Sequence, residues 1–115
     1  QLDAYLKDDL CKKDISAGLF LQLLDAMNRT GNQKTYQNWN KQLPVLLVSG
    51  SDDPVGDQGK GVLNVFKSMK KAGCTHVEYK LYPKARHDLL HEDCLNVTET
   101  VCSDIKDSML GLAEK

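Results

Sequence analysis

The sequence of 115 residues predicts an α/β fold with a parallel sheet, and three observations indicate it. Residues 44–49 form a short, continuously apolar run, which is typical of a parallel strand covered on both faces. Residues 77–82 alternate apolar and polar side chains, which is typical of a second strand. An amphipathic segment over residues 59–72 joins the two runs, so the order strand, helix, strand predicts a βαβ crossover.

The residues before the first strand are expected to contribute helices. Residues 1–15 are polar and irregular, and Asp14 or Ser16 can cap a helix that ends near Gly31. Between these points apolar side chains recur at helical spacing, and such a stripe is more often part of a core than of a ligand pocket. The stripe comprises Leu19, Phe20, Leu23, Leu24 and Met27.

Three more helices complete the expected order. A short helix over residues 35–40 would place Tyr36 and Trp39 on one face. The crossover helix over residues 59–72 has a stripe formed by Val62, Val65, Phe66 and Met69. The last helix, over residues 91–112, would bury Cys94, Val97, Val101, Ile105 and Met109.

Two parallel strands do not bury both faces of a sheet or support an independent fold. We therefore expect further strands upstream of Gln1, which is not a methionine and marks a fragment boundary or a processing site. The fold class predicted for these residues is then the C-terminal part of a larger α/β protein. An unpaired strand edge would lead the fragment to associate with its missing N-terminal part or with itself.

Composition excludes several classes of function. The chain is 41% hydrophobic and 27% charged, and its net charge of -1 comes from interspersed residues, so neither nucleic acid nor an anionic membrane is indicated as a partner. Its longest apolar run is too short to span a membrane, and no secretion signal is present. The cysteines show no metal-binding spacing and are interpreted as free thiols of a cytoplasmic protein, with a disulfide pair as the alternative. They are Cys11, Cys74, Cys94 and Cys102.

Titratable side chains follow both predicted strands. Asp52 and Asp53 come after the first strand, and His87 and Asp88 after the second. The carboxyl ends of parallel strands meet at one edge of a sheet, so these loops should lie together. A carboxylate and an imidazole placed in this way are typical of the orienting acid and the general base of a hydrolytic triad.

Two segments resemble the α/β-hydrolases, in the branch of lysophospholipases and monoacylglycerol lipases (serine aminopeptidase S33 type). Residues 43–56, LPVLLVSGSDDPVG, are similar to the strand and acid loop of that family, and residues 82–92, YPKARHDLLHE, to its histidine loop. Residues 10–20 resemble the end of its helical lid. The resemblance implies a lid-derived segment over residues 1–40 and the last two strands of the hydrolase core over residues 41–115.

The resemblance also implies roles for individual residues. The family's acid lies three residues after the glycine, which is Asp53, and its histidine follows an arginine, which makes His87 the general base. We expect the two side chains to lie ~2.6–3.2 Å apart. The implied substrate of the parent enzyme is a lipid ester such as a lysophospholipid or a monoacylglycerol, and no metal or organic cofactor is implied. The residues that would contact the acyl chain are Leu19, Phe20 and Leu23.

The nucleophile of this family is absent from the chain. None of the six serines lies in a GxSxG motif, so we expect an active serine esterase as parent and an inactive fragment. The alternative is a non-catalytic binding or interaction domain derived from an α/β-hydrolase. The head group and acyl length of a substrate are not specified by the sequence.

Weaker interpretations compete at single positions. Asp53 could cap the helix that follows it, although Asp57 is better placed to do so. His87 and His91 have an HxxxH spacing, but a third metal ligand at a suitable distance along the chain is lacking. The glycines at 56–61 do not fit a phosphate loop, and the neighbouring aspartates would repel an anion. His76 is expected to be an exposed side chain without a function.

Overall fold

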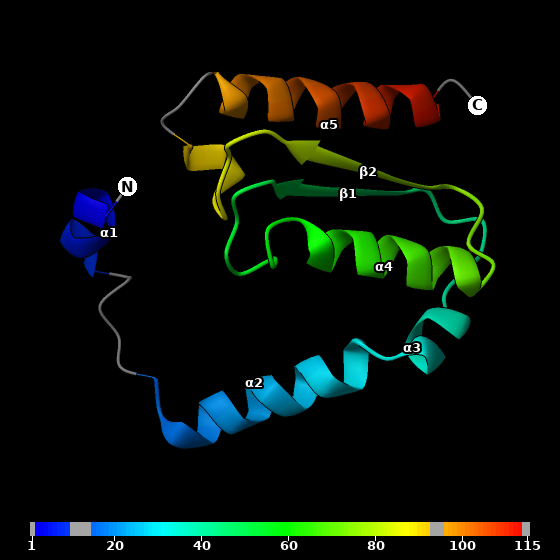
Figure 1. The fold of residues 1–115 in the computed structure, drawn as a ribbon, viewed down its shortest axis with the longest axis horizontal. Helices are drawn as coiled ribbons and strands as arrows, with labels where there is room; N and C mark the ends of the chain where they lie inside the picture. The colour runs from blue at the N-terminus through cyan, green and yellow to red at the C-terminus, as the bar shows by residue number, and fades with distance from the viewer. Residues whose placement is uncertain (1, 10–14, 93–95, 114–115) are drawn as a thin grey trace.

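The computed structural model describes residues 2–9, 15–92 and 96–113, and it shows helices arranged around a two-stranded parallel sheet (Figure 1). The elements are, in order, α1 (Leu2–Lys7), α2 (Ala17–Thr30), α3 (Gln33–Gln37), β1 (Val45–Gly50), α4 (Lys60–Lys71), β2 (Val77–Tyr82), the 3-10 turn η2 (Leu89–His91) and α5 (Val97–Ala113). The α/β class predicted from the sequence is confirmed.

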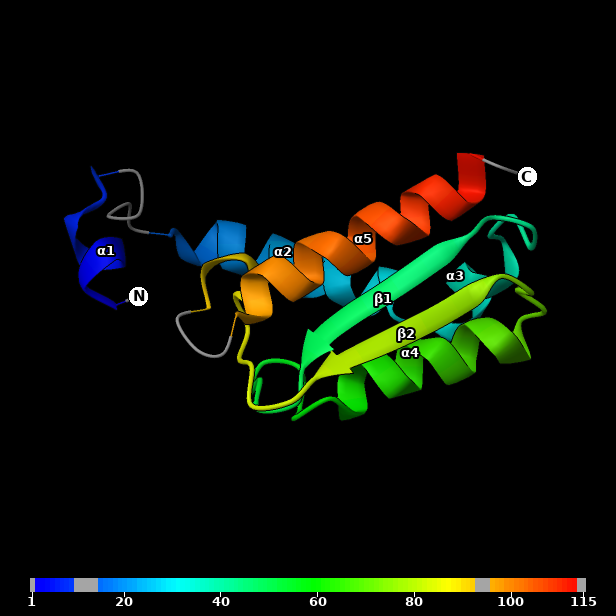
Figure 2. The ribbon, with the colours of Figure 1, turned by 90° about the horizontal axis from the view of Figure 1, so that it is seen from above.

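The sheet pairs β1 with β2 in parallel, from Val45 opposite Val77 to Gly50 opposite Tyr82. Helix α4 connects the two strands and covers one face of the sheet, while α5 covers the other face (Figures 1 and 2). The predicted crossover is therefore present. It brings the carboxyl ends of both strands to the same edge of the sheet.

The buried side chains form two clusters, one on each face of the sheet. The cluster on the α4 face contains Tyr36, Met69, Cys74 and Val77, with Val45, Leu47, Val65 and Phe66 packed against it. The cluster on the α5 face contains Tyr82, Ala85, Leu89, Val97 and Val101, with Val48 and Ile105 packed against it. Neighbouring residues of β1 thus serve opposite faces, as expected of a strand that is apolar throughout.

Local chemistry explains the limits of two helices. The Ser16 side chain accepts a hydrogen bond of 3.2 Å from the Leu19 amide at the start of α2, and the Gly31 amide donates to the Met27 carbonyl at its end. Helix α4 begins after Gly59, whose φ of 85° lies in the left-handed region that glycine adopts without strain. The expected limits of both helices are therefore confirmed to within about one residue.

The structure corrects the expected end of the chain. A continuous helix over residues 91–112 was expected, but η2 ends at His91 and α5 begins at Val97. The backbone of Glu92 is extended (φ -77°, ψ 124°), and Asn96 has a left-handed φ of 54°, so neither residue can continue a helix. Cys94, expected to be buried in that helix, lies outside the described residues, and Met109 is exposed.

Two corrections concern the N-terminal part. Helix α1 occupies residues that were expected to be irregular, with Asp3 in its first turn and Lys7 in its last, which suits the helix dipole. The apolar stripe of α2 was expected to be mostly core, yet α2 has no buried residue and its leucines, Phe20 and Met27 are 44–66% exposed. Helix α2 lies beyond α4, away from the sheet (Figure 1). Within the described part of the chain, no helix has the length and apolar character needed to cross a membrane.

Candidate active site

The loops that follow β1 and β2 are joined backbone to backbone. The Ser51 amide donates to the Tyr82 carbonyl and the Asp52 amide to the Ala85 carbonyl, each at 2.9 Å. At Gly50 a Cβ atom would collide with the backbone of Ala85 and Arg86, so the absence of a side chain allows the loops to touch. The acid loop and the histidine loop therefore form one unit at the edge of the sheet.

Asp53 and His87 meet in this unit. Oδ2 of Asp53 lies 3.0 Å from Nδ1 of His87, and Oδ1 accepts a hydrogen bond of 2.9 Å from the Val55 amide. Only 5% of Asp53 is exposed. The expected contact is therefore present, and it involves the aspartate chosen from the glycine spacing. Its neighbour Asp52 is exposed and accepts a hydrogen bond of 2.7 Å from the Ser51 hydroxyl.

The surroundings of Asp53 favour its ionised form. Burial of the carboxyl acts to raise its pKa, but hydrogen bonds from His87 and from the Val55 and Gly56 amides outweigh that effect, so the pKa lies below its ordinary value. An ionised Asp53 can only accept hydrogen bonds, so Nδ1 of His87 must carry the proton between them. This selects the tautomer in which Nε2 is the free base.

His87 is accessible from solvent. Its side chain is 67% exposed, and Nε2 has no hydrogen-bond partner among the described residues. A buried, ionised acid behind an exposed imidazole is an arrangement that can remove a proton from an incoming hydroxyl group.

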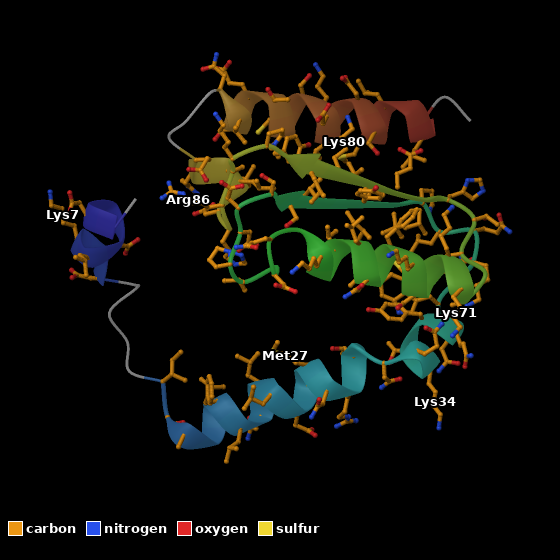
Figure 3. The ribbon with its side chains drawn as sticks, viewed as in Figure 1. Lys7, Met27, Lys34, Lys71, Lys80 and Arg86 are labelled. Atoms are coloured by element: carbon orange, nitrogen blue, oxygen red, sulfur yellow. The ribbon has the colours of Figure 1, made fainter. Side chains whose placement is uncertain are left out.

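Glu92 belongs to the same region, although no role was predicted for it. Its side chain is fully buried, and Oε2 accepts a hydrogen bond of 2.7 Å from the Arg86 amide. Oε1 lies 2.7 Å from Nη2 of Arg86, which is placed beside η2 (Figure 3). A signal was available in the sequence, since an arginine immediately before His87 and an acid six residues after that arginine can form an ion pair across a tight loop.

The structure does not bring the other candidate residues to this site. Leu19, Phe20 and Leu23 are exposed on α2 and line neither the cavity beside the sheet nor the smaller one next to Tyr82. The larger cavity, about 770 Å³, lies between the sheet and the C-terminal half of α5. Neither Asp53 nor His87 lines this cavity, so the hydrogen-bonded pair lies apart from it.

Among the described residues, His87 and His91 are not joined by further side chains that could complete a metal site. Nδ1 of His91 lies 3.0 Å from Oδ1 of Asp88 on the exposed surface of the histidine loop. Across residues 2–9, 15–92 and 96–113, no three His, Cys, Asp or Glu side chains gather in a group that could hold a metal ion. Lys60, at the glycine-rich turn, lies 3.7 Å from Asp57, and His76 is exposed.

Comparison with known proteins identifies the family to which this chain is similar. The family described as serine aminopeptidase, S33, matches residues 1–94. A monoglyceride lipase of Saccharomyces cerevisiae is 34% identical over 95 residues, which cover 77% of this chain and 29% of that protein. The chain therefore spans less than a third of the length of the relative that it matches. No solved structure matches it significantly.

Proposed function

We propose, since the chain belongs to the serine aminopeptidase S33 family of α/β-hydrolases, that Asp53 and His87 are the acid and the general base of a serine-type ester hydrolase. The observation that carries the proposal is the 3.0 Å contact between a buried aspartate and an exposed histidine at the carboxyl edge of a parallel sheet. The matching of residues 1–94, which include both side chains, supports it.

In the proposed reaction, Nε2 of His87 takes the proton of a serine hydroxyl as the serine oxygen attacks an ester carbonyl. Asp53 holds the Nδ1–H tautomer and stabilises the imidazolium that forms. The imidazolium then gives its proton to the leaving alcohol. In the second half of the reaction, His87 takes a proton from water as the water attacks the acyl-enzyme, and the proton returns to the serine oxygen as the acid is released. None of the serines here lies in GxSxG, so the nucleophile would come from polypeptide outside these 115 residues.

The proposed substrate is a lipid ester such as a monoacylglycerol or a lysophospholipid. The name of the yeast relative, monoglyceride lipase, supports this class. We assign residues 1–40 to the end of a lid and residues 41–115 to the C-terminal part of the hydrolase core. In this assignment the exposed side chains of Leu19, Phe20 and Leu23 contact the acyl chain, which would explain why an apolar stripe remains uncovered on α2.

The test compares neighbouring residues of the same type in the complete gene product that contains this chain. Hydrolysis of monooleoylglycerol and of lysophosphatidylcholine is measured for Asp53→Asn and His87→Ala, with Asp52→Asn and His91→Ala as matched controls. We expect losses on the order of 10³–10⁴-fold in kcat for the first pair and wild-type rates for the second.

Two results would count against the proposal. Full activity of Asp53→Asn would remove this residue from the catalytic machinery. A gene product that binds a lipid ester but never hydrolyses it, with or without these substitutions, would favour the alternative of a non-catalytic binding domain.

A further inference from the structure

We infer that Glu92 is the positioning residue of His87, because its buried carboxylate holds both the backbone and the side chain of the residue before the histidine. The inference rests on the proposed function in one respect: it assumes that His87 is the group whose position matters. The contacts that support it are independent of any reaction.

The first support is the burial of the Glu92 carboxylate. None of the Glu92 side chain is exposed, whereas 54% of the Arg86 side chain is. Oε2 lies 2.7 Å from the Arg86 amide nitrogen and 3.4 Å from Nε, and Oε1 lies 2.7 Å from Nη2. A buried carboxylate is costly unless it is fully paired, and here Arg86 supplies both a guanidinium fork and a main-chain donor.

The second support is that the same stretch of backbone is held from the other side. The Ala85 carbonyl accepts a hydrogen bond of 2.9 Å from the Asp52 amide, and Ala85 is fully buried. Gly50 lies so close that any side chain there would meet the carbonyl groups of Ala85 and Arg86. The residues before His87 are thus held between the acid loop and Glu92.

The third support is the anchoring of Glu92 to α5. The Thr98 hydroxyl, in the first turn of α5, lies 3.4 Å from the Glu92 carbonyl and 3.2 Å from the Leu89 carbonyl. Leu89 and Val97 are both buried in the cluster on the α5 face. Through its contacts with Glu92, and those of Glu92 with Arg86, α5 therefore helps to fix the backbone that leads into His87.

Positioning is the expected role because the Glu92 carboxylate acts on Arg86, the residue whose backbone leads directly into His87. Removal of the carboxylate would take away the Oε2 acceptor that holds the Arg86 amide, so the loop would lose this restraint on its position. A shift of about 1 Å at a catalytic group is enough to reduce a rate on the order of a hundredfold.

The test uses the complete gene product that contains this chain, labelled with ¹⁵N, and compares Glu92→Ala and Glu92→Gln with Glu99→Gln, an exposed acid in the first turn of α5. Two quantities are measured: the exchange rate of the Arg86 amide and the NMR signal of the His87 Nδ1 proton. In Glu92→Ala we expect the amide to exchange about tenfold faster or more, and the Nδ1 signal to broaden or disappear.

Glu92→Gln keeps one acceptor oxygen, so we expect it to preserve much of the Arg86 protection and a visible but shifted Nδ1 signal. Glu99→Gln should match the wild type in both measurements. If Glu92→Ala fails to fold, the comparison of Glu92→Gln with Glu99→Gln still decides, because only the former should change the Nδ1 signal.

An unchanged His87 signal in a folded Glu92→Ala chain would overturn the inference, whether or not the complete gene product is an esterase. Conversely, an inactive gene product whose His87 signal depends on Glu92 would overturn the proposed function and leave the positioning role intact. In an active gene product, Glu92→Ala should lower kcat more than it raises KM, and it should change the pH dependence of kcat. A purely structural defect would only reduce the amount of active enzyme and would leave the pH dependence of both constants unchanged.

Discussion

The Tyr82 hydroxyl donates a hydrogen bond of 2.8 Å to Asp104, which joins the last residue of β2 to the middle of α5. Nζ of Lys80 lies 2.6 Å from the other oxygen of the same carboxylate. Burial, followed by the bond to Asp104, raises the pKa of Tyr82 above its ordinary value, and the bond from Lys80 lowers the pKa of Asp104. Helix α5, which carries Thr98, is therefore held against the sheet by polar contacts as well as by apolar packing.

The first prediction concerns this network. Tyr82→Phe removes the donor to Asp104 without creating a cavity, so we expect the free energy of unfolding to fall by about 1 kcal/mol. Urea unfolding followed by circular dichroism measures the change. Tyr79→Phe is the matched control on the same strand, where the ring packs 4.9 Å from Phe66 and is partly exposed. Equal effects of the two substitutions would contradict the prediction.

The second prediction concerns acid stability. The pKa of Asp53 is lower in the folded chain than its ordinary value of 3.8, so the unfolded chain binds more protons near that pH. The stability contributed by Asp53 is thus fully present above about pH 4 and is lost as the pH falls through the folded pKa. We expect Asp53→Asn to unfold at a lower urea concentration at pH 6 and to show a shallower loss of stability below pH 4. Asp52→Asn is the control, and a pH profile of Asp53→Asn parallel to that of the wild type would refute the expectation.

The third prediction compares two glycines. Gly50→Ala would place a methyl group against the backbone of the histidine loop, so we expect a loss of about 1–3 kcal/mol in stability and a weakened contact between Asp53 and His87. Gly111 lies in α5 with nothing within 4 Å of an added Cβ, so Gly111→Ala should instead stabilise the chain by roughly 0.5–1 kcal/mol. Thermal unfolding of both variants tests whether the two substitutions change the stability in opposite directions.

The fourth prediction is that the 115-residue chain hydrolyses no esters by itself. The proposed acid and base are in place, but no serine lies in a GxSxG motif. The purified chain is assayed with short-chain nitrophenyl esters. Its rates should equal those of buffer alone and those of the His87→Ala chain. Turnover that a serine-directed fluorophosphonate abolishes would show that one of the six serines is a nucleophile after all.

The fifth prediction is that this chain does not remain a concentration-independent monomer. In the described residues the sheet consists of β1 and β2, so each strand has an unpaired edge, and the apolar stripe of α2 is exposed. Covering a few hundred Å² of such surface is worth several kcal/mol at ~25 cal/mol per Å². Light scattering over a dilution series should show association, and Phe20→Gln with Leu23→Gln should reduce it more than Gln22→Lys does.

Those elements that the sequence predicted correctly have strong local signals. The strands and α4 were found from an apolar run, an alternating run and an amphipathic segment, and each lies within about one residue of its expected position. The pair formed by Asp53 and His87 followed from the topology, because a crossover places both loops at one edge. The resemblance to the family, drawn from residues 43–56 and 82–92, is confirmed by the family match.

What could not be predicted depends on surroundings that local patterns do not describe. Periodicity identified the apolar side of α2 but carries no information about what covers it, so its exposure was missed. The start of α5 depends on the left-handed backbone at Asn96, which no apolar pattern reveals. The spacing of Arg86 and Glu92 allows an ion pair, but it does not show that the Glu92 side chain is completely buried, which is rare for a glutamate and arises only when the loop has folded.

The division of the core into two clusters has a consequence for how the chain opens. The cluster on the α4 face joins residues 36–77, while that on the α5 face joins residues 82–101, and β1 contributes Leu47 to the first and Val48 to the second. Leu47→Ala and Val48→Ala should therefore accelerate the opening of different layers. Cys74, buried in the α4 layer, is a built-in reporter, because its rate of reaction with a thiol reagent measures how often that layer separates from the sheet.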